Sequence, residues 1–433
     1  MRAAGEGQDE SKKEARMGDD VYILGIGMIR FSKYLEKGVK QLTGEALRLV
    51  LEDAGLDLGD LEAAWFSNSN WGYYSFQHSI RGQVALSANG LEGIPITNVE
   101  NACASGSTAL HAAWTSIRAG LYDCVLAIGA EKLYDTDRAK VMMGFLSGTD
   151  VEVAAKMLAD FQAAEAKRKE RLGQAQGGSQ VEQKPGGHSA FMDLYAMGAR
   201  RHMEQYGTTQ RQLAVIASKA HNNSTLNPLA QYNFPMTVEE VLADREIVYP
   251  LTRAMCAPIG DGAAAAVVCS ERFLRFRGGS SRAVRIRASV LRSGRREGEN
   301  DICGRVSKAA YEMAGLGPED VDVAEVHDAT AFGELYQTEQ MGFCPIGEGG
   351  PFAESGATAL GGRIPVNPSG GLIARGHPIG ASGLAQIYEL VLQLRGEAGK
   401  RQVAGARIAM AENGGGFLGL GEAAMTIHIL EKV

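Results

Sequence analysis

The sequence predicts an α/β fold built from two similar halves. Short runs of aliphatic residues with the character of strands alternate along the chain with Ala- and Leu-rich segments of helical character. This succession occurs twice, once in each half of the chain. Alternating strands and helices are typical of mostly parallel sheets covered by helices. With 433 residues and 45% hydrophobic content, the chain is long enough for a large core and for two or three domains.

The repeat is clearest when matching elements are compared in order. Each half opens with a strand, continues with an amphipathic helix and a second strand, and later has an Ala/Leu-rich helix followed by another strand. The predicted pairs are 21–27 with 284–290, 43–54 with 303–314, 63–67 with 323–327, 106–120 with 383–396, and 124–131 with 407–412. A repeat this long indicates a duplicated domain rather than a solenoid.

The repeat and the changes in composition suggest the domain boundaries. The expected parts are a disordered tail (1–20), an N-terminal half (21–148 and 237–275), a segment of different composition (149–236) and a C-terminal half (280–433). Within the third part, residues 163–187 combine a basic run with a Gly/Gln/Ser stretch, which predicts a mobile loop. A helix is expected from Phe191 to Tyr206, where Met and aromatic residues fit either a packed face or one wall of a pocket.

Composition argues against several function classes. The net charge of -7 and the isoelectric point near 5.7 give no reason to expect nucleic-acid binding. The six cysteines are scattered and form no CxxC pair, so neither a zinc site nor a thioredoxin-like motif is indicated, and a reducing cytoplasm fits better than a disulfide framework. Residues 1–20 contain no apolar core of a signal peptide, and no run of about 18 apolar residues suggests a membrane span. We therefore expect a cytoplasmic protein.

Cys103 is the first candidate for chemistry. It follows a predicted strand at 94–99 and precedes the small-residue turn that opens the helix at 106–120. At a helix N-terminus, unpaired N–H groups and the positive end of the helix dipole favour a thiolate. The alternative is a buried structural cysteine, because free cysteine is among the most buried residue types. This segment alone leaves both interpretations open.

His327 and Asp328 stand where a predicted strand ends. Polar groups at the carboxyl end of a parallel strand usually face the ligand crevice of an α/β protein. A His-Asp pair in this place can equally belong to a helix cap, because aspartate is a good N-cap residue.

His377 lies between Gly376 and Pro378 in a segment rich in glycine, proline and serine, from 367 to 383. Such a segment predicts a tightly turned loop that lets a substrate approach the backbone closely. An imidazole held in this loop could take the proton of a thiol, as in a Cys–His pair. We favour this role over a structural histidine.

The last candidate segment contains Glu412 and the triple glycine 414–416. Glycines expose backbone N–H groups that can bind a developing oxyanion. Glu412 is expected to end the preceding strand, where a partly buried carboxyl group could act as a general acid or base near neutral pH. Taken alone, the segment would also fit a glycine-rich β-turn with a solvated glutamate.

Together these segments resemble a known family in their order and spacing. The matching motifs are Asn-Ala-Cys-Ala-Ser-Gly at 101–106, Gly-Asp-Gly-Ala-Ala-Ala at 260–265, Gly-His-Pro-Ile-Gly-Ala-Ser-Gly at 376–383 and Gly-Gly-Gly at 414–416. With the duplicated halves, they make the chain resemble the thiolase superfamily from about residue 21 to residue 430. The resemblance implies two βαβαβαββ halves in a five-layer α-β-α-β-α arrangement, with 149–236 as a loop domain over the active site. It also implies a tight homodimer, or in some members a tetramer.

The resemblance implies roles for single residues. Cys103 matches the nucleophile that becomes acylated, and His377 matches the histidine that activates this cysteine and helps bind the thioester oxygen. Gly414 matches the residue whose backbone N–H joins the N–H of Cys103 in a second oxyanion hole.

Two positions depart from classical thiolases. His327 stands where those enzymes have the asparagine of an Asn-Glu-Ala-Phe segment, and this version resembles the sterol-carrier-protein thiolase branch, which would place His327 at the first oxyanion hole. Classical thiolases have a second cysteine, and the sterol-carrier branch a His-Asn pair, where this chain has Glu412 and Asn413. A carboxyl group could transfer the proton if burial raises its pKa. The resemblance leaves open which of the two residues takes the acid/base role.

The implied activity is a CoA-dependent thiolase that cleaves a 3-ketoacyl-CoA through an acyl-Cys103 intermediate, with coenzyme A as co-substrate and without a metal. The departure at Glu412 suggests a branched, aromatic or otherwise bulky acyl group, as in a benzoylsuccinyl-CoA-type or a sterol side-chain thiolase. Relatives on this branch pair with a small zinc-containing OB-fold protein, so such a partner subunit is one expectation. The alternatives are a retro-aldolase acting on a 3-hydroxyacyl-CoA, with His327 or Tyr336 moving the proton, and a non-catalytic acyl-CoA or lipid carrier. Retention of both Cys103 and His377 argues against these two.

Overall fold

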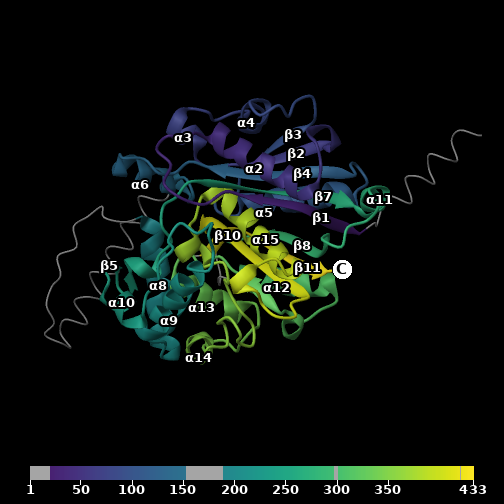
Figure 1. Cartoon of the computed structure of the whole chain (residues 1–433). Helices are drawn as coiled ribbons and strands as arrows, with labels where there is room; N and C mark the ends of the chain where they lie inside the picture. The colour runs from purple at the N-terminus through teal and green to yellow at the C-terminus, as the bar shows by residue number, and fades with distance from the viewer. Residues whose placement is uncertain (1–19, 153–188, 297–300, 420) are drawn as a thin grey trace, which may run out of the picture.

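A computed structural model describes residues 20–152, 189–296, 301–419 and 421–433 (Figure 1). The predicted tail, apart from Asp20, and the predicted mobile loop at 163–187 lie outside the described residues. The expected alternation of strands and helices is present, and most predicted elements agree with the observed ones to within a few residues.

Nine strands form one large mixed sheet. They are β1 (Val21–Met28), β2 (Ala63–Ser67), β3 (Ile96–Val99), β4 (Cys124–Glu131), β7 (Gly262–Ser270), β8 (Val284–Ser293), β9 (Val323–Glu325), β10 (Ile408–Leu418) and β11 (Gly421–Lys432). Their order in the sheet is β3-β2-β4-β7-β1-β8-β11-β10-β9. The order β2-β4-β7-β1 in the first half is matched by β9-β10-β11-β8 in the second, which confirms the predicted duplication. The halves meet at β1 and β8, where only Tyr22 with Arg285 and Ile23 with Val284 are paired.

The prediction of mostly parallel sheets is wrong. Only β2 with β3, β2 with β4, and β9 with β10 run parallel. The other neighbours in the large sheet are antiparallel. The reason is that β7 and β11 each return beside the preceding strand of the sheet, β11 through a tight turn at Gly419 that closes a hairpin with β10. The helix crossovers that force a parallel pairing therefore account for only part of the connections.

Helices cover both halves and fill the space between them. Helix α2 (Val39–Ala54) covers the outer face of the first half together with α4 (Arg81–Ser87), while α12 (Ile302–Ala314) covers the outer face of the second. Helices α5 (Ser105–Arg118) and α15 (Ile379–Arg395) lie between the two halves of the sheet and share one core with both (Figure 1). The result is the expected α-β-α-β-α succession.

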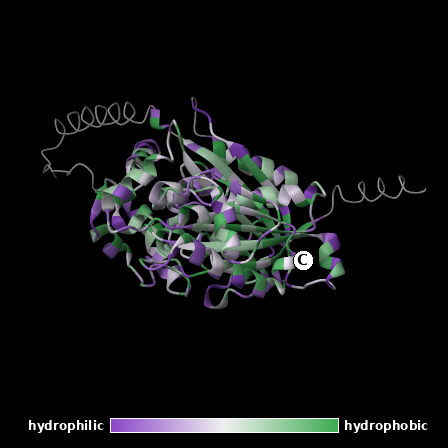
Figure 2. Cartoon of the chain, turned by 90° about the horizontal axis from the view of Figure 1, so that it is seen from above, coloured by the Kyte–Doolittle hydropathy of each residue, from purple (hydrophilic) through white to green (hydrophobic). Residues whose placement is uncertain are grey.

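The two central helices differ in character because their surroundings differ. Helix α5 buries Ala109, Ala113 and Ile117, a helical stripe that faces the core. Helix α15 is buried on nearly every side, and its sequence is apolar on nearly every side as well. Seen from above, hydrophobic residues gather along the central strands, and hydrophilic residues gather on the outer helices and loops (Figure 2).

Small residues let the beginnings of α5 and α15 come close together. A Cβ atom added to Gly383 would lie 2.5 Å from the backbone nitrogen of Ser107, and one added to Gly106 would lie 3.0 Å from the carbonyl oxygen of Gly380. Both glycines are therefore required by the approach of the two backbones. Because Cys103 precedes one helix and His377 the other, this contact brings the two segments together.

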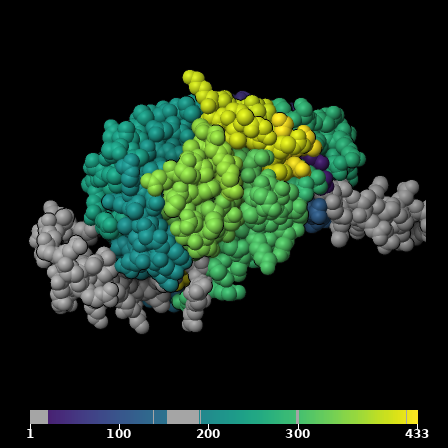
Figure 3. Space-filling model, turned by 90° about the horizontal axis from the view of Figure 1, so that it is seen from below, coloured from purple at the N-terminus to yellow at the C-terminus, as the bar shows by residue number. Residues whose placement is uncertain are grey.

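A separate hydrophobic cluster lies at one side of the halves. It joins α8 (Ala190–Tyr206), α9 (Gln210–Ser224), α10 (Val238–Ala243), the small sheet of β5 (Glu246–Val248) and β6 (Leu251–Thr252), and α13 (Ala331–Gln340). From below, the surface of residues near 190–250 lies directly against segments of the C-terminal half (Figure 3). The helix expected at Phe191–Tyr206 is present as α8. Among the described helices, none is long and apolar enough to span a membrane.

Candidate active site

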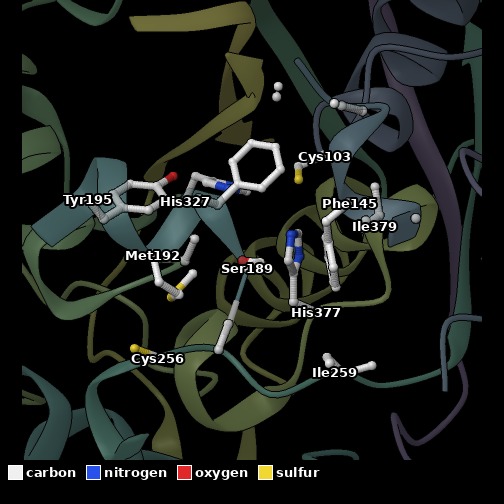
Figure 4. A pocket seen from close by; sticks show the side chains of 18 of the residues that line it. Cys103, Phe145, Ser189, Met192, Tyr195, Cys256, Ile259, His327, His377 and Ile379 are labelled. Atoms are coloured by element: carbon white, nitrogen blue, oxygen red, sulfur yellow. The ribbon is translucent and has the colours of Figure 1, made fainter. Parts of the chain in front are cut away.

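A cavity of about 210 Å³ opens where the two halves and the lateral cluster meet (Figure 4). Its wall combines Cys103 of the N-terminal half with His327, His377 and Gly414 of the C-terminal half. Further lining residues come from α6 (Arg138–Leu146), α8, the segment 245–259, and the ends of β10 and β11. Helix α8 fulfils both of its predicted roles, since Met192 and Tyr195 line the cavity while Ala196 is packed in the lateral cluster.

Cys103 sits in a strained turn between β3 and α5. Ala102, the residue before it, has a φ of 47°, in the left-handed region that residues with a side chain rarely adopt. The turn is held by hydrogen bonds from the Ala102 N–H to Glu100 Oε1 (2.7 Å) and from the Asn101 N–H to Ser105 Oγ (2.9 Å). The Cys103 side chain is half-buried and lies in the cavity wall.

The expectation that the helix N-terminus makes Cys103 a thiolate is wrong for the resting site. Burial raises the pKa of the thiol to about 12, and this outweighs the lowering effect of the N–H that Gly416 donates to the sulfur. Burial disfavours the charged form of the thiol, and the backbone N–H groups of Gly416 and Cys103 compensate for only part of this effect. The nucleophile is therefore a neutral thiol at neutral pH, and its reaction requires a nearby base.

His377 is held as a neutral base. Its Nδ1 lies 2.7 Å from Ser382 Oγ, and that hydroxyl donates its own hydrogen to the Pro378 carbonyl at 2.9 Å. Ser382 can therefore only accept from the histidine, so Nδ1 carries the proton and Nε2 keeps a free lone pair. Burial, with smaller effects of His327 and Arg375, lowers the pKa of His377 well below its ordinary value.

His327 is held in the opposite tautomer, with its ring proton on Nε2. Its backbone N–H donates to Glu412 Oε2 at 2.8 Å, which fixes the start of the loop after β9. The Asn413 Nδ2 group lies 3.1 Å from Nδ1 of the ring, while Asn413 Oδ1 faces Ser107 Oγ at 2.7 Å. With the amide in this orientation Nδ1 accepts, and the ring proton is on Nε2. Burial lowers the pKa of His327 to about 4, so the ring is neutral.

These side chains converge on one point in the cavity. The Cys103 Sγ atom and one ring nitrogen from each of His327 and His377 all lie within 4.8 Å of one another. Figure 4 shows the three side chains directed toward a common space. A thiol, an imidazole lone pair and an imidazole N–H thus face the same small volume, an arrangement suited to nucleophilic attack on a carbonyl group.

Asp328 does not cap the helix that follows it, and its side chain instead holds a neighbouring loop in place. The N-cap of α13 is Thr330, whose side chain accepts from the Gly333 N–H. Asp328 instead accepts from the Leu372 N–H at 2.6 Å and is fully buried. It fixes the loop that leads to His377.

The expectation that Glu412 ends a strand is wrong, and the alternative of a glycine-rich β-turn is wrong as well. Strand β10 continues through all of them to Leu418. The glycines serve close packing: a Cβ atom on Gly415 would lie 2.2 Å from the Asn101 carbonyl oxygen and 2.5 Å from the Ala104 nitrogen. The strand therefore presses against the turn that carries Cys103, and Gly414 and Gly416 line the cavity beside it.

Glu412 is fully buried and stands next to the cavity without being one of its lining residues. Its Oε1 atom has no hydrogen-bond partner among the described residues and lies 3.6 Å from the place that a Cβ on Gly414 would occupy. Burial, with a smaller contribution from the nearby Glu422, raises the pKa of this carboxyl group to about 8. Glu412 is therefore a neutral carboxylic acid at neutral pH, with a proton available for Oε1.

Sequence reasoning missed Glu422. This residue is the second of β11, is only 5% exposed, and lines the cavity beside Gly414. Gln337 Nε2 donates to its Oε1 atom at 3.3 Å. A carboxylate that directly follows the glycine-rich end of one strand and precedes an apolar run is the signal that could have identified it. Tyr195 also lines the cavity, whereas Tyr336 is not among the lining residues.

A buried carboxylate that the sequence analysis did not single out supports the site. Glu131, at the end of β4, accepts from the backbone N–H groups of Ser69 (2.9 Å), Asn70 (3.1 Å) and Gly380 (3.0 Å). It thereby ties the cavity wall of the N-terminal half to the beginning of α15, next to His377.

Two arginines at the edge of the cavity could meet an anionic ligand. Arg245 and Arg253 both line it and are exposed, and Arg253 also pairs with Asp244 at 2.8 Å. Guanidinium groups in this position suit phosphate oxygens.

Family comparisons cover most of the chain. The description "Thiolase, N-terminal domain" matches residues 21–249, and "Thiolase C-terminal domain-like" matches residues 298–432. An acetyl-CoA acetyltransferase of Methanothermobacter thermautotrophicus is 38% identical over 420 residues, which cover 95% of this chain and 100% of that protein. Sterol carrier protein 2 of Bos taurus is 36% identical over 406 residues, covering 91% of this chain and 69% of that protein.

A solved structure has the same fold. The complex named "Ltp2-ChsH2(DUF35) aldolase" superimposes with a TM-score of 0.74, covering 95% of this chain and 98% of the compared chain, at 24% sequence identity. At this identity the likeness concerns the fold, not the activity.

Proposed function

Because this chain belongs to the thiolase superfamily and is a thiolase-type acyltransferase, we propose that it cleaves a 3-ketoacyl-CoA through an acyl-Cys103 intermediate. The observation that carries the proposal is the convergence of the Cys103 sulfur with ring nitrogens of His327 and His377 within 4.8 Å. The two histidines are neutral and offer opposite functions, a lone pair and an N–H, to the same space.

The first half-reaction acylates Cys103. Because the pKa of the Cys103 thiol is raised, the sulfur is protonated before the reaction. His377 Nε2 therefore takes the thiol proton as the sulfur attacks the 3-keto carbon. The bond between C2 and C3 then breaks, and its electron pair moves to C2 as the enolate of the departing acyl-CoA. The Nε2–H of His327 donates to the thioester oxygen, on which the enolate charge develops.

A carboxyl group then protonates the enolate carbon. Glu412 is neutral at neutral pH and has a free Oε1 atom, while Glu422 lines the cavity beside Gly414. We assign the acid/base role to Glu412. We assign Glu422 a supporting role, because it raises the pKa of Glu412 and so keeps Glu412 protonated. Asn413 has no titratable proton, and its contact with His327 gives it a positioning role instead.

The second half-reaction transfers the acyl group from Cys103 to the thiol of free CoA. Before this step, the proton that His377 took from Cys103 passes to the ionised Glu412, which restores both groups. His377 then takes the proton of the attacking CoA thiol and gives it to the leaving Cys103 sulfur. The backbone N–H groups of Cys103 and Gly414 are proposed to hold the oxyanion of the acyl group. Arg245 and Arg253 at the edge of the cavity are suited to the phosphates of CoA.

The acyl group is proposed to be bulky and apolar, as in aromatic or branched acyl-CoAs. The support is the cavity wall, where Phe145, Phe191, Met192 and Phe417 surround the space next to Cys103. A wide aromatic wall favours ring-shaped or branched groups over a short acetyl chain. Benzoylsuccinyl-CoA and sterol side-chain thiolysis remain the two specific candidates.

The protein is further proposed to act as a homodimer, with a small zinc-containing OB-fold protein as a candidate additional subunit. The aldolase complex that shares the fold includes a DUF35 component in its name, which supports testing for a partner of this kind.

Product analysis tests the proposed function. The protein is incubated with benzoylsuccinyl-CoA or a branched 3-ketoacyl-CoA, with and without free CoA, and the products are identified by liquid chromatography and mass spectrometry. A thiolase forms two acyl-CoA products and consumes one free CoA. The matching 3-hydroxyacyl-CoA is incubated in parallel. A retro-aldolase would release an aldehyde or ketone from it without consuming CoA, whereas a carrier would return both kinds of substrate unchanged.

A further inference from the structure

We propose that Cys103, His327 and His377 also bind a thiophilic divalent cation such as Zn²⁺ in the acyl-free protein. The three donors are one sulfur and two imidazole nitrogens, a set that suits Zn²⁺ and excludes hard cations such as Mg²⁺. Three protein ligands leave the fourth position of a tetrahedral ion open to water. This site is independent of the proposed function, because binding requires no substrate and no turnover.

The distances fit with small adjustments. The donor atoms lie within 4.8 Å of one another. Around a tetrahedral Zn²⁺ with bonds of about 2.0 to 2.3 Å, ligand atoms are roughly 3.5 Å apart, so each side chain has to move by about 1 Å or less. The rings of His327 and His377 are 5.2 Å apart between centroids and cross at 79°, so their edges can approach one ion without the rings colliding.

The hydrogen-bond partners of each histidine suit metal binding. His377 already donates its Nδ1–H to Ser382 Oγ, which leaves Nε2 ready as a ligand. His327 needs the same tautomer, and a rotation of the Asn413 amide provides it by turning Oδ1 toward Nδ1.

That rotation leaves no polar group without a partner. It turns Asn413 Nδ2 toward Ser107 Oγ, and the Ser107 hydroxyl can then donate to the Ala104 carbonyl oxygen, which lies 3.0 Å away. Asn413 and Ser107 therefore support both tautomers of His327, one for an oxyanion hole and one for a metal site.

The surroundings admit a cation. The three ligands line a cavity that is open to solvent, so an ion has a path of entry. Glu422 lines the same cavity and adds a carboxyl group to its wall. A bound ion would occupy the lone pairs of both Cys103 and His377, so it would hold the protein in a form that cannot be acylated.

Cobalt substitution tests the site directly. Co²⁺ added to the metal-free chain should produce a thiolate-to-cobalt charge-transfer band in the near ultraviolet, with one ion bound per chain. The band should disappear in Cys103→Ser, a change of one atom that leaves the fold intact. Cys256→Ala is the matched control, because this cysteine lines the same cavity but lies away from Cys103 (Figure 4).

Zinc binding by the same variants completes the test. Competition against a chromogenic chelator should show binding that is weaker by roughly 100-fold in Cys103→Ser and in His377→Asn, with Cys256→Ala unchanged. Zn²⁺ should also protect Cys103, but not Cys256, from iodoacetamide. Equal zinc affinity in Cys103→Ser, or a charge-transfer band that follows Cys256, would overturn the proposal. Failure of the thiolase assay would leave these results untouched.

Discussion

The rings of His327 and His377 lie 5.2 Å apart beside the Cys103 sulfur, and their Nδ1 atoms are held by partners of opposite character. Ser382 accepts from His377, whereas Asn413 donates to His327. Two residues of the same type therefore present different groups to the cavity, a lone pair from one and an N–H from the other. One ring can offer a lone pair and the other an N–H only if both rings are neutral. Burial keeps them neutral, because it lowers the pKa of both histidines below the ordinary range.

Changing Asn413 to Asp should reverse the tautomer of His327. A carboxylate beside Nδ1 accepts a proton there, so Nε2 loses its hydrogen, and the pKa of the ring rises. The rate of carbon–carbon bond cleavage of a 3-ketoacyl-CoA should fall by about 100-fold, the usual effect of losing one oxyanion donor, because the enolate oxygen no longer receives the Nε2–H of His327. Nitrogen-15 NMR of the histidine rings reports the tautomer, and an unchanged His327 signal in the variant would refute the assignment. Ser382→Ala, which alters His377 instead, serves as the comparison.

Changing Gly415 to Ala should disrupt the turn that carries Cys103. The added methyl group would collide with the Asn101 carbonyl oxygen at 2.2 Å and the Ala104 nitrogen at 2.5 Å, both of them backbone atoms. We expect a loss of about 1–3 kcal/mol in the free energy of unfolding and a large loss of acylation. Gly59→Ala is the control, since nothing lies within 4 Å of its added Cβ. Thermal unfolding of both variants measures the difference, and equal midpoints would speak against this packing.

Changing Glu412 to Gln should separate acylation from carbon–carbon bond cleavage. The amide keeps the shape of the side chain but has no acidic proton, so protonation of the enolate should slow by about 100-fold or more. Acylation of Cys103 by a simple acyl-CoA involves no enolate and should be nearly unchanged. Glu422→Gln is expected to lower the pKa of Glu412 and to shift the pH profile of cleavage to lower pH. Full cleavage activity in Glu412→Gln would move the acid/base role to Glu422.

The raised pKa of Glu412 also predicts a pH dependence of stability. In the folded chain this group keeps its proton up to about pH 8, whereas in the unfolded chain it ionises near its ordinary value of 4.5. The folded state thus binds more protons between these values, so its stability falls as pH rises. From pH 6.5 to 8.5, the free energy of unfolding of the native chain should fall by about 2 kcal/mol relative to Glu412→Gln.

Comparing two chains that differ only at residue 412 isolates this effect. Glu131 and Glu325, whose pKa values burial also raises to about 7, contribute equally to both chains and cancel. His327, with a pKa near 4, changes stability only below its ordinary pKa and so lies outside this pH window. Denaturant unfolding at the two pH values measures the difference. Parallel curves for the two chains would show that Glu412 is ionised in the folded state.

Much of the fold follows from local patterns in the sequence. Strands β2 and β4 begin and end where predicted, because each is a buried apolar run bounded by residues that favour turns. The central helices were also recognisable, and so was the meeting of the Cys103 and His377 segments, since both come from motifs that resemble one family. The sheet direction was not. Strand β11 follows β10 through a tight turn, and β7 returns beside β4 only after the long segment that contains α6, α8, α9 and α10, so neither connection is the single helix crossover that marks a parallel pair.

The parts of the site that the sequence did not reveal depend on neighbours from distant segments. Glu422 reaches the cavity through the register of the hairpin between β10 and β11, which no periodicity in the sequence displays. The continuation of β10 through Gly416 depends on the backbone of the Cys103 turn, which belongs to the other half of the chain and leaves no room for a side chain. The protonation of Cys103 likewise reflects burial by both halves, whereas the local argument considered only the helix that follows it.

The measurement that tests the central claim most directly is the mass of the intact protein after exposure to acetyl-, succinyl- and benzoyl-CoA. We predict an added mass equal to one acyl group on the native chain, located by peptide mapping at Cys103, released by free CoA and missing from Cys103→Ala. The mass would also identify the preferred acyl group. If no acyl-CoA in the panel modifies the native chain, alone or with a co-purified partner, or if Cys103→Ala is modified equally, the acyl-Cys103 mechanism is wrong.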